Sequence, residues 1–210
     1  MLMTSNLLPE PELTRRDFVG RGAVGVAGAG LALTALPSWA AQDASAEILL
    51  RQGGGVAVFR HALAPGTFDA RGFRLGDCST QRNLSDDGRV QARRIGEWFT
   101  ERQLQPDKVL SSPWCRCVDT ATLAFNASTA WAALGSPYGA PETTGAAHLR
   151  ELRKALVTAS ARSGTFQVWV THSFVQSDLA SDSTRSGEAL IVRAQPGVQP
   201  QVLARWPTPT

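Results

Sequence analysis

Short apolar runs and helical apolar spacings alternate along most of this chain. Four runs bounded by polar or glycine residues predict buried β-strands. They cover residues 56–60, 108–111, 166–171 and 188–194. Between them, apolar side chains at helical spacing predict helices that begin after Ser85, at Pro113 and at His148. Strands alternating with helices indicate a layered α/β fold, which binds its ligands outside the carboxyl ends of the strands.

The helix boundaries carry ordinary start signals. Ser85 can cap the first helix, and the acidic residues Asp86 and Asp87 suit its first turn. Pro113 suits the first position of the second helix, which we expect to run through Phe125, and the third helix should end at Ser160. The buried face expected for the first helix consists of Val90, Ile95, Trp98 and Phe99.

The N-terminal segment has the layout of a signal peptide. Paired arginines in Thr14-Arg-Arg-Asp-Phe-Val-Gly20 precede an uncharged run from Ala23 to Leu36, and the pattern resembles a twin-arginine signal. Cleavage is expected after Ala40, which gives a signal peptide of residues 1–40 and a single domain of residues 41–210. We therefore expect a periplasmic or secreted protein with no stable membrane anchor after cleavage. An uncleaved N-terminal anchor is the alternative, although the apolar run is shorter than the roughly 20 residues that a spanning helix needs.

Net charge and cysteine content indicate which partners and which disulfides to expect. The 210 residues are 43% hydrophobic and carry a net charge of +3 without a long Lys/Arg run, so no nucleic-acid partner is expected. In an oxidising compartment Cys78 can pair with Cys115 or with Cys117. Cys115 and Cys117 should point apart on one helical turn, and no zinc-ligand spacing surrounds them.

Two histidines and two arginines are expected at one edge of the sheet. Arg60 and His61 end the first strand, His172 ends the third, and Arg116 lies one turn into the helix after the second. Guanidinium groups match phosphate oxygens, and a neutral imidazole among them can attack phosphorus to give a covalent intermediate. A second histidine can stabilise the transition state, and this chemistry needs no metal or other cofactor.

These residues resemble the signatures of a known family. Phe59-Arg60-His61-Ala62, the run Ser111-Ser-Pro-Trp-Cys-Arg116, and Val170-Thr-His172 are similar to the three motifs of the histidine phosphatase superfamily. Leu84-Ser-Asp-Asp-Gly88 resembles the stretch that opens the first helix of that family. The similarity extends over roughly residues 54–195. It implies a three-layer α/β sandwich with a mostly parallel central sheet, phosphoglycerate mutase-like. It also implies that His61 is the nucleophile and that Arg60, Arg116 and His172 form the phosphate pocket.

The chain departs from the family pattern at two points. Ala62 replaces the usual glycine after the nucleophile, and alanine disfavours a positive φ. The usual general acid has no obvious counterpart: Glu142, in a Pro/Gly-rich stretch, is one candidate, and Asp69 and Asp77 are others. Without an acid, substrates with good leaving groups are favoured. The further substrate-binding candidates are Arg82, Asn83 and Trp114.

The resulting prediction is an exported phosphomonoesterase that forms a phosphohistidine on His61. A catalytically degenerate phosphate-binding protein is the first alternative, and a phosphomutase is the second. Arg71, Arg74 and Arg82 precede the first helix and would suit a polyanionic or sugar phosphate, for which a cell-envelope sugar phosphate is one hypothesis based on analogy.

Overall fold

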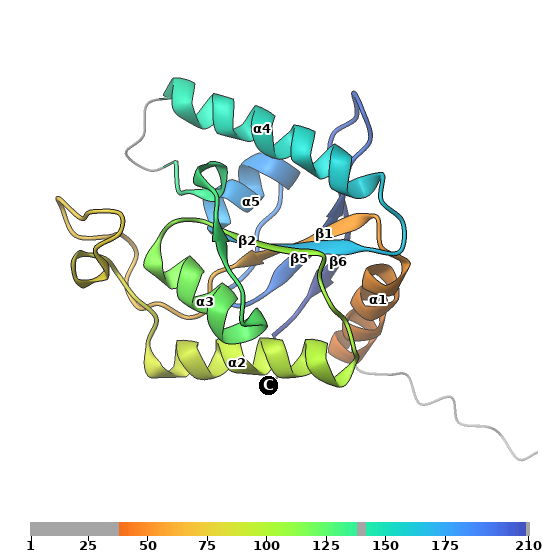
Figure 1. Cartoon of the computed structure of the whole chain (residues 1–210), viewed down its shortest axis with the longest axis horizontal. Helices are drawn as coiled ribbons and strands as arrows, with labels where there is room; N and C mark the ends of the chain where they lie inside the picture. Colours follow the sequence, from red (N-terminus) through yellow and green to blue (C-terminus); the bar gives the residue numbers. More distant parts are fainter. Residues whose placement is uncertain (1–37, 138–141, 209–210) are drawn as a thin grey trace, which may run out of the picture. The chain divides into compact units, whose positions relative to one another are not determined.

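The centre of the molecule is a β-sheet with the strand order β3-β2-β4-β1-β5-β6 (Figure 1). The computed structural model describes residues 38–137 and 142–208, with side chains from residue 42 onward. Within these residues β5 is antiparallel to β1 and β6, and all other strand pairs are parallel, which confirms the mostly parallel sheet. The strands are β1 (Gly55–Arg60), β2 (Lys108–Ser111), β3 (Thr129–Ala130), β4 (Phe166–Thr171), β5 (Ala189–Arg193) and β6 (Gln201–Trp206).

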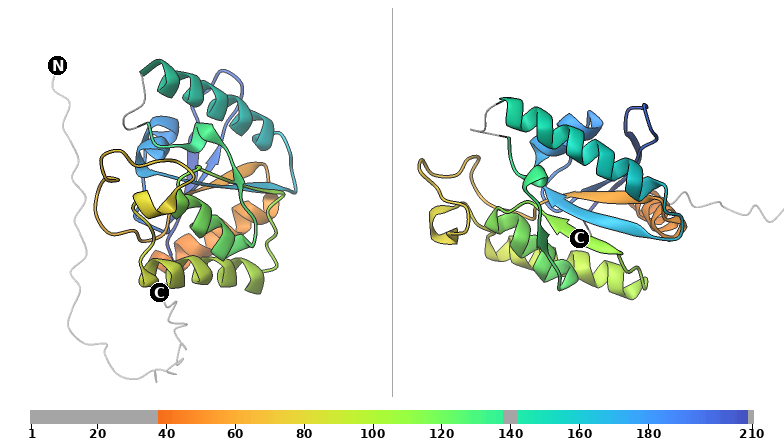
Figure 2. Two further views of the ribbon diagram at one scale, coloured as in Figure 1. Left: turned by 60° about the vertical axis from the view of Figure 1, so that its left-hand side comes forward. Right: turned by 45° about the horizontal axis from the view of Figure 1, so that its top comes forward.

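Helices cover both faces of this sheet, as the three-layer prediction requires (Figures 1 and 2). One face packs against α1, α2 and α3, and the other packs against α4 and α5. The helices are α1 (Ser38–Gln52), α2 (Asp86–Glu101), α3 (Cys115–Phe125), α4 (Glu142–Ser160) and α5 (Ser173–Ala180). Two 3-10 turns, η1 (Cys78–Thr80) and η2 (Ala132–Leu134), lie in the connections.

Two apolar cores hold the layers together. On the α2 side, the ring of Phe59 in β1 packs edge-on against Trp206 at 5.3 Å and tilted against Phe99 at 6.1 Å. On the α4 side, Leu152 and Leu156 bury against strand residues, among them Trp169. Burial of each such side chain stabilises the fold by about 1.5–3 kcal/mol.

Helix α2 approaches its neighbours closely at two glycines. A Cβ on Gly96 would lie 2.1 Å from the Ala124 carbonyl oxygen, and one on Gly88 would lie 2.0 Å from that of Leu63. These contacts fix which face of α2 is buried and explain why the prediction for Val90 was wrong: its side chain is 41% exposed. The buried residues of α2 are Gly88, Ala92, Ile95, Gly96, Trp98 and Phe99.

Several element boundaries differ from the predicted ones. Pro113 precedes the N-cap residue Trp114, so α3 begins two residues later than expected. Helix α4 begins at Glu142 rather than at His148, so Glu142 is helical and not in a loop. Helices α1 and α5 were not predicted, because their apolar residues lack a strong helical periodicity. Near the C-terminus, β6 forms an edge strand of the sheet.

Most of the predicted signal peptide lies outside the described residues, which begin at residue 38. Helix α1 spans the expected cleavage point after Ala40, and cleavage there stays a prediction. In the part of the chain that the structure describes, no helix is long and apolar enough to cross a membrane.

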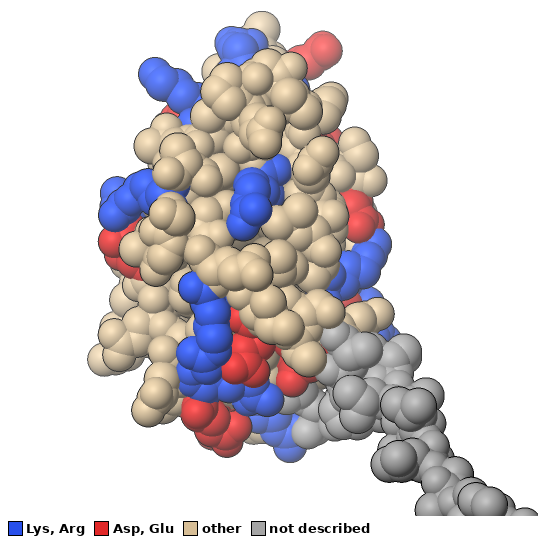
Figure 3. Space-filling view, turned by 90° about the vertical axis from the view of Figure 1, so that its right-hand side faces the viewer, with Lys and Arg blue, Asp and Glu red and all other residues tan. Residues whose placement is uncertain are grey.

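Covalent and ionic contacts tie the outer helices and loops together. Cys78 and Cys115 form a disulfide, one of the two pairings predicted, and Cys117 is free and buried. Arg102 at the end of α2 pairs with Asp43 and Glu47 of α1 at 3.3 Å each. On the face shown in Figure 3, Lys and Arg side chains are scattered, and several lie beside Asp and Glu side chains.

Candidate active site

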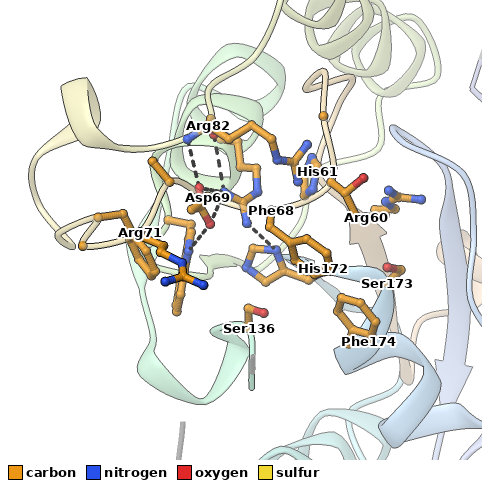
Figure 4. Close-up of a pocket in the computed structure, with 17 residues that line it drawn as sticks. Arg60, His61, Phe68, Asp69, Arg71, Arg82, Ser136, His172, Ser173 and Phe174 are labelled. Atoms are coloured by element: carbon orange, nitrogen blue, oxygen red, sulfur yellow. Dashed lines mark hydrogen bonds and ion pairs between the residues drawn. The ribbon is translucent and has the colours of Figure 1, made fainter. Parts of the chain in front are cut away.

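The strand order brings three chemically active strand ends together. Strands β2, β4 and β1 are neighbours in the sheet, and their register pairs Arg60 with Thr171 and Ser111 with Val170. The residues that follow these strands line a cavity of about 510 Å³ (Figure 4). The predicted site residues among its lining are Arg60, His61, Asp69, Arg82, Trp114, Arg116 and His172.

His61 is held in the state that a nucleophile needs. Its Nδ1 lies 2.7 Å from the Ala62 carbonyl oxygen, which can only accept, so we assign the proton to Nδ1 and the lone pair to Nε2. Burial, with the charges of Arg116, Arg82 and Arg60, lowers the pKa of His61 to about 3, although the hydrogen bond to the Ala62 carbonyl acts in the opposite direction. The imidazole is therefore neutral at pH 7 and able to attack an electrophile in the cavity.

His172 lies beside His61, with ring centroids 5.6 Å apart. Its Nε2 lies 2.9 Å from the Ser112 hydroxyl, which also accepts from the Trp114 amide at 3.3 Å. Arg116 Nη2, which can only donate, lies 3.4 Å from His172 Nδ1, so we assign Nδ1 as the acceptor and Nε2–H as the donor to the Ser112 hydroxyl. Burial, together with Arg116, keeps the pKa of His172 well below its usual value, so this ring also stays neutral.

Three arginines approach the two histidines. Arg60 donates to the Thr184 carbonyl at 3.3 Å, Arg82 donates to the Ala64 carbonyl, and Arg116 pairs with a carboxylate. The buried Nε atoms of all three have no hydrogen-bond partner among the described residues. All three arginines line the cavity, and guanidinium groups match phosphate oxygens.

The carboxylate that pairs with Arg116 belongs to Asp69, in the loop after β1. Its oxygens lie 2.9 and 3.2 Å from Arg116 Nη1 and accept from the Arg82 amide at 2.9 Å and from Trp114 Nε1 at 3.1 Å. Burial by itself raises the pKa of Asp69, but these hydrogen bonds and the charge of Arg116 outweigh it and lower the pKa. Asp69 is therefore an anion that orients Arg116 and joins the loop to α3.

Some predicted site residues lie elsewhere. The amide of Asn83 donates to the Cys78 carbonyl at 2.7 Å, and Asn83 does not line the cavity. Glu142 is exposed at the start of α4 and is also absent from the lining, and its role as general acid stays a prediction. Asp77 pairs with Arg74 at 2.6 Å, away from the cavity.

The substitution of alanine for glycine after His61 leaves the local backbone in an ordinary conformation. Ala62 has no positive φ, its side chain is buried, and its amide donates to Thr120 Oγ1 at 3.0 Å. The expected change of loop geometry is thus not required. Within the described ranges no group of three or more His, Cys, Asp or Glu side chains is placed to hold a metal ion.

The structure adds lining residues that the sequence reasoning missed. Phe68, Phe73 and Phe174 contribute aromatic surface, and Ser136 lies between η2 and α4. Phe68 and Phe73 lie in a loop without periodic structure, and Phe174 follows His172 directly, so no pattern in the sequence distinguished them. Trp114 does wall the cavity, with its ring 5.3 Å from that of His172.

Known proteins share this fold at low sequence identity. A functionally characterised protein of Mycobacterium tuberculosis, Rv3214, is 15% identical, with a TM-score of 0.55 over 73% of this chain and 97% of its own. The protein histidine phosphatase SixA, complexed with tungstate, is 17% identical, with a TM-score of 0.48 over 72% of this chain and 95% of its own. A phosphoglycerate mutase of Thermus thermophilus is 16% identical, with a TM-score of 0.46 over 74% of this chain and 99% of its own.

Part of the amino-acid sequence also matches the model of a protein family. No curated protein matches the chain. Residues 45–133, which include Arg60, His61 and Arg116, match the model of the histidine phosphatase superfamily (branch 1). The third motif, with His172, lies beyond the matched residues but meets the first two in the cavity. Residues 45–133 thus resemble the histidine phosphatase superfamily, which includes phosphatases and mutases, and the described domain shares its fold with Rv3214.

Proposed function

We propose that this protein is a phosphomonoesterase that works through a phosphohistidine on His61. The observation that carries the proposal is a neutral, oriented imidazole that shares its cavity with three arginines. In the first step, Nε2 of His61 forms a bond to phosphorus as the bond to the leaving oxygen breaks. In the second step, water attacks phosphorus, the N–P bond breaks, and inorganic phosphate leaves with the imidazole restored.

The neighbouring side chains supply the electrostatics of both steps. Arg60, Arg82 and Arg116 neutralise charge on the phosphoryl oxygens, and His172 orients Arg116 by accepting from it at Nδ1. These cationic groups take the role that a metal ion has in other phosphoryl-transfer sites. We therefore expect turnover that does not depend on added metal.

The described site offers no evident proton donor for the leaving group. Asp69 is an anion engaged with Arg116, and Glu142 is outside the lining of the cavity. In the described structure no carboxylic acid is thus poised to donate a proton to the leaving oxygen. Ester substrates with weakly basic leaving groups need no such donor.

The other roles considered for the site are less well supported. A binding protein without turnover would not need the Nδ1–H tautomer of His61 that exposes Nε2. A phosphomutase would have to retain its phosphohistidine against water, and nothing in the described cavity favours this over hydrolysis. We also propose that the protein acts in the periplasm or outside the cell, on the basis of the N-terminal sequence pattern. Cell-envelope sugar phosphates therefore belong in a substrate panel.

The experiment that tests the proposal is hydrolysis of p-nitrophenyl phosphate by residues 41–210 in the presence of EDTA. We expect turnover that the His61→Ala variant loses by at least about 10³-fold, because no other group replaces the nucleophile. His148→Ala, which changes a histidine outside the cavity, is the matched control and should retain activity. Binding of vanadate without turnover from pH 4 to 8 would instead support the binding-protein alternative.

A further inference from the structure

The mouth of the cavity has a chemistry that the phosphate site does not explain. Phe68 comes from the loop after β1 and Phe174 from the first turn of α5, and both line the cavity (Figure 4). Their side chains are 52% and 50% exposed. Two large apolar side chains exposed at one opening mark a binding surface for an apolar group.

The inner wall continues this aromatic surface. The ring of Trp114 lies tilted against Phe73 at 5.8 Å and edge-on against the ring of His172 at 5.3 Å. A ligand that extends from the phosphate site toward the mouth therefore passes aromatic side chains from two loops and from α5. Planar rings pair well with such surfaces and gain about 0.5–1.5 kcal/mol per pair beyond burial.

One cation that lines the cavity has no polar partner among the described residues. Arg71 lines the cavity and is exposed, and it forms no ion pair or hydrogen bond with the described residues. Arg60, Arg82 and Arg116, in contrast, each donate to a protein oxygen. Arg71 is thus available for a second anionic group of a ligand whose phosphate lies deeper in the cavity.

Among the described lining residues no carboxylic acid is placed to protonate a leaving group, which points to the same kind of ligand. A phenol leaves as a weakly basic phenolate, whereas the alkoxide of a sugar or another alcohol needs a proton donor. The aromatic lining and the leaving-group chemistry therefore both favour an aryl phosphate.

We propose that the substrate is an aryl phosphomonoester whose ring carries a further anionic group, with the ring held by Phe68 and Phe174 and the anion held by Arg71. This inference rests on the proposed function for turnover, but ring recognition does not require turnover. In the reaction, the P–O bond to the ring oxygen breaks, the phenolate leaves with the electron pair, and it takes a proton from water.

Binding of inert phosphonates separates recognition from catalysis. Calorimetric titration compares methylphosphonate, phenylphosphonate and 4-carboxyphenylphosphonate, with EDTA present. We expect phenylphosphonate to bind at least about 10-fold more tightly than methylphosphonate, since two ring contacts of about 0.7 kcal/mol each give that factor. The carboxylate should add about 2–5-fold, as expected for an exposed ion pair.

Substitutions test which side chain is responsible for each increase in binding affinity. Phe68→Ala and Phe174→Ala should each weaken phenylphosphonate binding about 3-fold and leave methylphosphonate binding unchanged. Arg71→Gln should remove the gain from the carboxylate alone. Leu75→Ala is the matched control, since Leu75 lies in the same loop, is 51% exposed and does not line the cavity.

The outcomes distinguish this inference from the proposed function. Equal affinity for methylphosphonate and phenylphosphonate, or an equal loss of both in the phenylalanine variants, would overturn ring recognition. Equal affinity for the two arylphosphonates would overturn the role of Arg71. If sugar phosphates are turned over faster than aryl phosphates, the substrate class is wrong although the phosphatase proposal stands. If the ring preference is found without any turnover, the proposed function fails and the occupant is still aromatic.

Discussion

The buried pair of Asp69 and Arg116 gives the sharpest test of how this site is assembled. The two side chains are 9% and 5% exposed, and Arg116 Nη1 lies 2.9 Å from Asp69 Oδ1. Asp69→Asn preserves the shape of the side chain and an acceptor for the Arg82 amide, but it removes the negative charge. Arg116 is then a buried cation without a counterion.

The size of the effect follows from the geometry. Opposite charges about 4 Å apart attract by about 4 kcal/mol at an effective dielectric constant of 20. Breaking one side of a buried pair costs about 3–5 kcal/mol, because the remaining charge is left uncompensated. Since the asparagine still accepts hydrogen bonds, we expect the free energy of unfolding to fall by about 2–4 kcal/mol.

Urea denaturation at pH 7 without phosphate measures this loss. Vanadate supplies a negative charge beside Arg116, so it should stabilise Asp69→Asn more than the parent protein. Asp107→Asn breaks an exposed pair with Arg162 and should cost less than about 1 kcal/mol, which makes it the control. An Asp69→Asn variant that unfolds at the same urea concentration as the parent, or that gains no more from vanadate, would refute the reasoning.

Three further predictions concern the fold and the ionisation of the site. Gly96→Ala should lower the free energy of unfolding by about 2–3 kcal/mol in urea denaturation, because its Cβ would lie 2.1 Å from the Ala124 carbonyl oxygen; an unchanged midpoint would mean that α2 and α3 are not so close. Cys78→Ser opens the disulfide, which spans 37 residues of sequence, and should cost about 2–4 kcal/mol in the same assay, with no further loss when reductant is added. His61 has a pKa of about 3 in the folded protein, so the unfolded chain binds its proton first as the pH falls below about 6.5. Stability should therefore decrease from pH 6.5 toward pH 3, by about 2 kcal/mol at pH 5 for His61 alone, and His61→Asn should make this pH dependence shallower; an equal slope in the variant would contradict the low pKa.

The residues of the proposed phosphate site could be found from the sequence because most of them follow strands. A short apolar run that ends in Arg60 and His61, or in His172, identifies both the strand and the side chains at its carboxyl end. Since the carboxyl ends of parallel strands lie at one edge, the sequence pattern was sufficient to place these residues near one another. The caps and periodicity of α2 likewise depend on neighbours within the chain, and its start at Ser85 was confirmed.

Other features depend on contacts between distant segments. Asp69 lies in a loop without periodicity, and only the packing of that loop on α3 brings its carboxylate to Arg116, 47 residues further along the chain. The same packing selects Cys115 rather than Cys117 as the partner of Cys78, because Cys117 faces the core beside His172. The order β2-β4-β1, which places the two histidine rings side by side, is also a property of the folded sheet. The sequence by itself thus determined which groups carry the chemistry, because local pattern marks strand ends. Only the tertiary structure decided how those groups are charged, oriented and enclosed, because burial and ion pairing arise between residues that are far apart in the chain.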